Sequence, residues 1–181
     1  SGNYFNQQGQ FEKSSFERGG IQFNIQHRAS DNVKFGLNTN LTASRTDFIS
    51  SENGINLNNP FAFAYLANPY EQVYHPDGSF QFGAVGRNPF EEVFYNDRFN
   101  KKLNAIGIAF LEIKFLKDFT FNTQGAINYR TTNSDTYISP NSRLGTTVTG
   151  ASGSLNRGLG NRSEGTFTNT LNWTKRFGDN H

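Results

Sequence analysis

Residues 21–42 read IQFNIQHRASDNVKFGLNTNLT, and this stretch predicts the architecture of the chain. Apolar residues such as Ile21, Phe23 and Phe35 alternate with polar ones on both sides of Ser30-Asp31-Asn32. A period of two is typical of a β-strand whose two faces meet different surroundings. Asp and Asn favour tight turns, because their side chains hydrogen-bond the nearby backbone. The stretch therefore predicts a hairpin of two long antiparallel strands.

The same alternation recurs along the chain and predicts an all-β fold, an antiparallel meander of about six long strands. The expected strands cover about residues 2–8, 16–29, 33–47, 101–115, 119–131 and 165–177. Further short turns are expected at Lys117-Asp118 and Gly178-Asp179-Asn180, whereas residues 48–100 and 132–164 form long polar excursions. All short connections thus fall at one end of the strands. This asymmetry is typical of an outer-membrane β-barrel, which has short periplasmic turns and long extracellular loops.

Composition supports this interpretation by exclusion. Hydrophobic residues make up only 34% of the 181 residues, yet aromatic residues make up 15%, and disordered chains are poor in aromatics. No window approaches the roughly eighteen consecutive apolar residues of a membrane-spanning helix. The net charge of +2 is small and the basic residues are dispersed, which argues against a nucleic-acid partner. The absence of cysteine excludes disulfides and thiolate metal sites.

Six strands cannot close a transmembrane barrel, because the smallest known type has about eight. An open sheet in lipid would leave unpaired backbone groups at its edges. The chain also opens at Ser1 directly in a strand-like pattern, with no visible signal peptide. We therefore expect it to be an interior piece of a larger barrel.

Aromatic residues gather near the end of the strands that carries the short turns. These are Phe115, Phe119, Trp173 and Phe177, and we interpret them as one of the aromatic girdles that mark a membrane interface. General β-propensity is the alternative explanation, since aromatics favour strands anywhere. The expected strand at residues 101–115 is apolar on both faces, so its lipid-facing side is left open.

The first excursion offers candidate binding residues for a ligand or partner. Its aromatic residues include Phe61, Phe63, Tyr65, Tyr70 and Tyr74. They would stack on sugar rings, bury a peptide side chain, or only pack the loop onto the barrel rim. A helical turn is expected from Pro60 and a β-turn at Pro76-Asp77-Gly78.

The remaining polar candidates are weaker. Arg143, Arg157 and Arg162 in the second excursion would contact lipopolysaccharide phosphate or a ligand carboxylate, or be merely solvated. Glu91 and Glu92 are adjacent acids in a polar loop, where solvation is the usual outcome, so a glycosidase pair is a minor alternative. The three histidines lack metal-ligand spacing. We expect no metal, no cofactor and no enzymatic activity.

Several stretches together resemble the early barrel strands of SusC/RagA-type TonB-dependent outer-membrane transporters. They are YFNQQG at 4–9, FER at 16–18, IQFN at 21–24, VKFGLNTNL at 33–41, NPY at 68–70, PDGS at 76–79, FLE at 110–112, LKDF at 116–119, TNTLNW at 168–173 and FGDNH at 177–181. The resemblance covers essentially the whole chain and rests on the order and spacing of these stretches.

The resemblance implies a 22-stranded barrel that imports oligosaccharides or peptides beneath a SusD-like surface lipoprotein. Import would be energised by the TonB complex through an N-terminal plug, which this chain lacks together with most of the strands. The implied location is the outer membrane of a Gram-negative bacterium, in contact with lipid and lipopolysaccharide. The alternative is a soluble extracellular β-sheet that acts as a binding or adhesion module.

Overall fold

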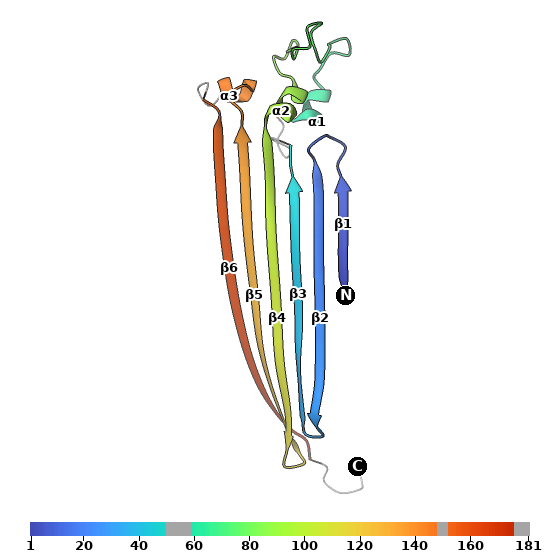
Figure 1. Cartoon of the computed structure of the whole chain (residues 1–181), viewed down its shortest axis with the longest axis vertical. Helices are drawn as coiled ribbons and strands as arrows, with labels where there is room; N and C mark the ends of the chain where they lie inside the picture. The colour runs from blue at the N-terminus through green and yellow to red at the C-terminus, as the bar shows by residue number, and fades with distance from the viewer. Residues whose placement is uncertain (50–58, 148–151, 176–181) are drawn as a thin grey trace.

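Six antiparallel strands lie side by side in chain order, and a small helical cap covers one end of them (Figure 1). A computed structural model describes residues 1–49, 59–147 and 152–175. The strands are β1 (Gly2–Gln8), β2 (Ser15–Ser30), β3 (Val33–Asp47), β4 (Asp97–Phe115), β5 (Phe119–Ile138) and β6 (Ser154–Trp173). The predicted all-β class and the meander order are confirmed. The described strands form one open sheet, with β1 and β6 as its edges.

The two described short turns lie at the end of the sheet opposite the cap. Asp31 and Asn32 connect β2 to β3, and the backbone N–H of Asn32 donates to Oγ of Ser30. Residues 116–118 connect β4 to β5, with Leu116 and Lys117 in the left-handed region at φ of 50° and 62°. A non-glycine residue seldom adopts that conformation. The third expected turn, at residues 178–180, lies outside the described residues.

Strand register divides the sheet into two faces that can be named by residue number. In β2 to β6, pairs such as Ile21 with Leu41, Leu41 with Ala105, and Ala105 with Tyr129 join odd residues to odd residues. Directly opposite residues of an antiparallel pair share a face. We call the two sides the odd face and the even face. In β1 the numbering is reversed, because Gly2 pairs with Ile21.

The second excursion is shorter than predicted. Residues 132–164 were expected to form a loop, but β5 continues to Ile138 and β6 already begins at Ser154. These strand segments are mostly polar, and the apolar residues on their odd face, Tyr137, Leu155 and Leu159, are too few to mark a clear hydrophobic period in the sequence. Cross-strand polar pairs accompany the extended ladder: the hydroxyl of Thr131 donates to Asn161 at 2.7 Å, and Arg157 lies 3.3 Å from Asp135. Smaller differences are the start of β4 at Asp97 and the end of β6 at Trp173.

Three short helices form the cap: α1 (Pro60–Ala64), α2 (Pro89–Tyr95) and α3 (Arg143–Thr147). Asn59 and Asn88 cap α1 and α2, each followed by a proline at the first helical position. That proline lacks only an N–H that would be unsatisfied there anyway. The predicted helical turn at Pro60 is confirmed. The predicted turn at residues 76–78 is confirmed as well, with Gly78 at a φ of 84°.

The sheet has no apolar core in the described part of the chain. Among the described residues, Ile49 is the one buried hydrophobic side chain. The buried polar side chains lie in or beside the cap, as do the buried prolines Pro60 and Pro89; the polar ones are Asn59, Asn88, Glu91, Glu92, Asn96, Ser139 and Ser142. No helix in the described part of the chain is long and apolar enough to cross a membrane.

Candidate membrane-facing surface and loop cap

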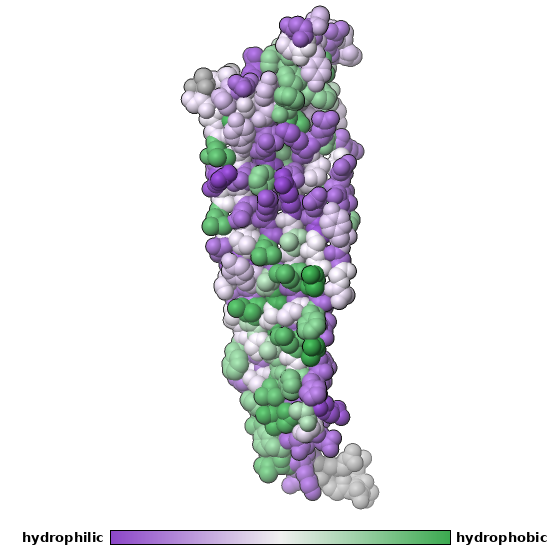
Figure 2. Space-filling model, in the orientation of Figure 1, coloured by the Kyte–Doolittle hydropathy of each residue, from purple (hydrophilic) through white to green (hydrophobic). Residues whose placement is uncertain are grey.

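The odd face carries a continuous apolar band in the half of the sheet nearest the short turns. Figure 2 shows apolar residues gathered toward that end of the visible face and hydrophilic residues toward the cap. The odd-face residues that form this apolar band are Ile21, Phe23, Ile25, Val33, Phe35, Leu37, Leu41, Ala105, Ala109, Leu111, Ile113, Phe115, Phe119, Phe121, Ile127, Tyr129, Phe167, Leu171 and Trp173.

The apolar band is exposed and contains no charged side chain. Ile21 is 65% exposed, Ile127 57% and Phe167 73%. The odd positions between these residues hold only small, neutral polar or imidazole side chains, such as Thr39, Gly125 and His27. On β5 the band runs over residues 119–129, which matches the roughly nine to eleven residues of a membrane-spanning strand. A monomeric soluble protein rarely exposes so large an apolar patch.

Charged residues begin where the apolar band ends. On the odd face they are Glu17, Arg45, Asp47, Asp97, Lys101, Asp135 and Arg157, all in the half nearest the cap. Most of them are paired: Arg45 lies 2.7 Å from Asp47, and Oγ of Ser15 donates to the same Asp47 carboxylate at 3.0 Å. The odd face is therefore uncharged in the half nearest the short turns and charged in the half nearest the cap.

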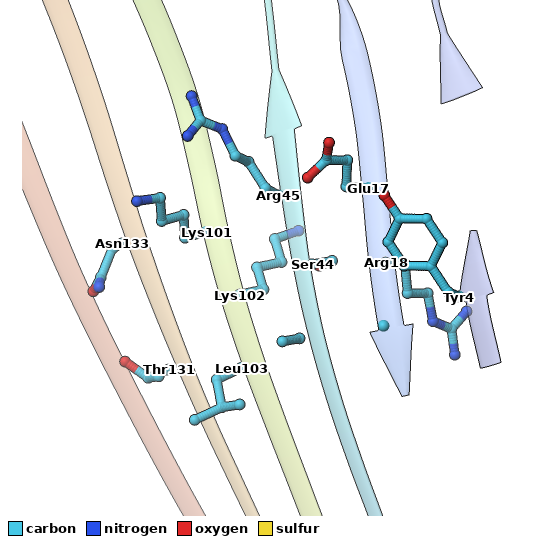
Figure 3. Close-up of a pocket in the computed structure, with 12 residues that line it drawn as sticks. Tyr4, Glu17, Arg18, Ser44, Arg45, Lys101, Lys102, Leu103, Thr131 and Asn133 are labelled. Carbon is cyan, nitrogen blue, oxygen red and sulfur yellow. The ribbon is translucent and has the colours of Figure 1, made fainter. Parts of the chain in front are cut away.

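A concavity of about 380 Å³ lies on the odd face at this boundary (Figure 3). Its lining includes Tyr4 and Glu17 at one side, Arg45 and Lys101 on adjacent strands, and Leu103 below them. Glu17 pairs with Arg45 in register, and Arg45 pairs with Lys101. The concavity thus combines an apolar floor with charges of both signs.

Aromatic rings cluster at the short-turn end of the apolar band, as the sequence predicts. Phe115 stacks on Phe119 with 5.6 Å between ring centroids, and Phe119 stacks on Trp173 at 6.4 Å. The fourth candidate, Phe177, lies outside the described residues. The described three come from three adjacent strands and form one row across the sheet.

Register also settles the face assignment of β4. Leu103, Leu111 and Ile113 share the odd face with Ile21, whereas Ile106, Ile108 and Phe110 lie on the even face. The ring of Phe110 covers Gly36, since a Cβ on Gly36 would meet that ring at 2.4 Å. A glycine on the neighbouring strand therefore makes room for an aromatic ring on the even face.

Buried hydrogen bonds join distant segments of the cap, beside the aromatic contacts among Phe80, Phe94 and Tyr95. Nδ2 of Asn88 donates to the carbonyls of Val73 and Gln81, each at 2.8 Å, while Oδ1 accepts from the backbone of α2. The backbone N–H of Ser139 donates to Oδ1 of Asn96 at 2.8 Å, which joins the end of β5 to the end of α2. Asn88 and Asn96 therefore connect segments that are distant in sequence.

Glu91 and Glu92 are buried, contrary to the expectation that they are solvated. Each is only 2% exposed. The backbone N–H of Arg143 donates to Oε1 of Glu91 at 2.8 Å, and Nδ2 of Asn96 donates to Oε2 of Glu92 at 2.6 Å. The sequence gives no sign of this burial, because the donor Arg143 lies more than fifty residues away.

Burial changes the protonation of this acidic pair. Desolvation, reinforced by the nearby Glu91 carboxyl, raises the pKa of Glu92 from 4.5 to about 7, while the Arg87 cation opposes the shift. Desolvation also raises the pKa of Glu91. The cavity beside Glu92 measures about 10 Å³, room for a single water at most and far too small for a sugar ring. Among the described residues, the space beside Glu92 is therefore too small for a glycosidase substrate.

The aromatic candidates of the first excursion occupy different environments in the cap. Tyr65 and Tyr70 are strongly exposed, at 91% and 81%. Phe63 is half-buried, Phe61 packs edge-on against Phe11 at 5.0 Å, and Tyr74 packs against Phe80 at 5.1 Å. Only part of the predicted set is thus free of packing contacts with other aromatic rings.

The arginine candidates are separated by the fold. Arg143 begins α3, and its guanidinium lies 4.8 Å from the ring centroid of Phe82. Arg157 lies on β6 rather than in a loop and forms the ion pair with Asp135. Arg162 also lies on β6, where it donates to Glu164 at 2.9 Å. The prediction that these arginines occupy one loop is therefore wrong.

No group of three His, Asp or Glu side chains that would hold a metal ion is present in the described ranges. No protein-family model matches the chain, and no curated protein matches it. The argument for function therefore rests on the two faces of the sheet and on the cap.

Proposed function

We propose that this chain forms part of the wall of an outer-membrane β-barrel that actively imports nutrients, of the SusC/RagA type. The observation that carries the proposal is the exposed, uncharged apolar band, whose height on β5 matches one crossing of a bilayer. In this arrangement the odd face contacts lipid and the even face lines the lumen. The short turns then point to the periplasm and the cap to the outside.

The open edges of the sheet support a larger assembly. β1 and β6 each have one partner strand among the described residues. Lipid offers no hydrogen-bond partner to a free edge, so a spanning sheet must close into a barrel. Further strands would complete the wall, and the resemblance puts their total at 22.

The proposed importer has further parts besides this section of the barrel wall. A plug would couple transport to the TonB complex, and a SusD-like lipoprotein would close over the outer opening. Oligosaccharides or peptides are the proposed substrates. The exposed rings of Tyr65 and Tyr70 on the cap would face that partner or the arriving substrate.

A soluble binding or adhesion module is the competing function. It would turn the odd face inward and cover it with a second layer, because exposed apolar area of this extent is unfavourable in water. Within the described ranges, no segment lies over the band as a second layer. This arrangement favours lipid contact over a sandwich.

The proposal is tested by fractionating cells that express the full protein. We expect it in the outer-membrane fraction, with migration in detergent gels that changes on heating as the barrel unfolds. Recovery as a soluble monomer in the periplasm would contradict the proposed function.

A further inference from the structure

The even face is strongly electropositive, whereas the odd face is nearly balanced. Along β2 to β6 the even face carries eight basic residues and two acids. The basic residues are Arg18, Arg28, Lys34, Arg98, Lys102, Lys114, Arg130 and Arg162, and the acids are Glu112 and Glu164. The corresponding odd-face residues are three basic and four acidic: Arg45, Lys101 and Arg157 against Glu17, Asp47, Asp97 and Asp135.

Four of these eight basic residues lie in two adjacent rows of the even face. Arg130 on β5 lies directly opposite Arg162 on β6, so two arginines are cross-strand neighbours on one face. Lys102 on β4 lies opposite Thr132, two residues along β5 from Arg130, and Arg18 belongs to the same row as Lys102. We call Arg18, Lys102, Arg130 and Arg162 the basic cluster.

The basic cluster is poorly neutralised by this chain. Glu164 accepts from Arg162. Within the described part of the chain, no ion pair involves Arg18, Lys102 or Arg130. Like charges directly opposite each other on a sheet are destabilising. Sequences break such local rules mainly at functional sites.

Neighbouring side chains are suited to bind an anion together with the cluster. Asn104 lies directly opposite Arg130 and supplies a carboxamide at the same level. Thr42 on β3 lies directly opposite Asn104, and Thr132 lies two residues after Arg130 on β5. Both side chains carry a hydroxyl. The guanidinium group of arginine matches the geometry of carboxylate and phosphate groups. Amide and hydroxyl groups add neutral hydrogen-bond donors.

We infer that the basic cluster is a binding site for an anionic solute, whose charge resides on carboxylate or phosphate groups. The inference rests on the proposed function, because it makes the even face the lumen wall and so restricts the substrate to acidic oligosaccharides or acidic peptides. The cluster lies toward the cap end of the sheet, so an arriving anion meets it before it reaches the level of the apolar band.

The absence of native cysteine in this chain permits a direct test. Thr132→Cys places a thiol inside the basic cluster, and Thr168→Cys places one on the same face with no charged residue in its row. Each variant of the full protein, in detergent, is reacted with a sulfonate-bearing and with a trimethylammonium-bearing methanethiosulfonate. The ratio of the two rates reports the local potential.

We expect the ratio of anionic to cationic reagent rates to be about tenfold higher for Thr132→Cys than for Thr168→Cys. Adding Arg130→Gln should lower the ratio at Thr132→Cys by about threefold or more. Equal ratios at the two positions, within about threefold, would overturn the basic cluster as an electropositive site. That outcome would mean that acids elsewhere in the full protein neutralise it.

Ligand chemistry is tested by protection from iodoacetamide, which is uncharged. Trigalacturonate should protect Thr132→Cys and leave Thr168→Cys reactive, whereas its methyl ester should protect neither. Protection by trigalacturonate but not by inorganic phosphate assigns a carboxylate ligand, and the reverse assigns a phosphate ligand. Protection by neither anion, or equal protection by the neutral ester, would refute the inference. Membrane fractionation is measured separately, so each of the two proposals fails on its own experiment.

Discussion

Single buried polar residues connect the segments of the cap. Asn88 donates two hydrogen bonds to loop segments and accepts two from the backbone of α2, and Asn96 connects α2 to the end of β5. A buried polar network is stabilising only when its members find partners. Glu91 and Glu92 each retain one buried carboxylate oxygen without a protein partner in the described residues. The acidic pair is therefore the sensitive part of this network.

The cap is expected to lose stability as the pH rises, because of Glu92. The raised pKa means that the folded cap keeps a proton that the unfolded cap releases above pH 4.5. The resulting stabilisation is fully present below pH 4.5 and is lost as the pH rises through about 7. The shift corresponds to at most about 3 kcal/mol.

Glu92→Gln should remove most of this pH dependence, since a glutamine keeps an acceptor for Asn96. The measurement is hydrogen exchange of α2 and α3 amides, compared between variant and parent at pH 5 and at pH 8. The variant should be the better protected of the two at pH 8 only. An equal difference at both pH values would show that Glu92 does not titrate in this interval.

At the scale of elements, neighbouring strands pack closely at particular positions, and Gly36 on β3 is the clearest case. A Cβ there would lie 2.4 Å from the Phe110 ring and 2.7 Å from the carbonyl oxygen of Ile25. Gly36→Ala should destabilise the β2–β3–β4 region by about 1–3 kcal/mol, the usual effect of overpacking. Gly165→Ala on β6 is the control, because a Cβ at that position would meet no described atom within 4 Å. Denaturant unfolding of the two variants should differ by that amount, and equal midpoints would contradict the packing.

The elements show which parts of the fold could be predicted from the sequence. Ile21, Phe23 and Ile25 alternate with polar residues, and this period predicts both the strand and its faces. Thr132, Ser134 and Thr136 continue β5 with no such period, so the second excursion was predicted too long. The pairing of Asp135 with Arg157 follows only from the register, which the sequence does not state.

The candidate site divides in the same way. The stacked Phe115, Phe119 and Trp173 were predictable, because their distance from the short turns can be counted along the chain. The burial of Glu91 and Glu92 was not, since it depends on donors from Asn96 and Arg143 that the fold brings to them. The basic cluster likewise appears only when Arg130 and Arg162 are placed in register.

At the scale of the whole molecule, the two faces of the sheet should respond oppositely to charge. Ile127 lies in the apolar band, and the adjacent Asn128 lies on the even face. Ile127→Lys should destabilise the membrane-inserted protein by about 2–4 kcal/mol, whereas Asn128→Lys should have a small effect. Folding into lipid vesicles, followed by the heat-dependent gel shift, measures both. Equal tolerance of the two lysines would indicate that neither face meets lipid.

The same alternation gives the most direct test of the central claim, that the odd face contacts lipid. Single cysteines at each of residues 121–129 of β5 are introduced into the full protein and treated in intact outer membranes with a water-soluble maleimide. We predict labelling at even-numbered positions, and at odd-numbered positions only after the membrane is dissolved and the protein unfolded. Equal labelling at odd-numbered and even-numbered positions, or stronger labelling at the odd-numbered ones, would contradict the account.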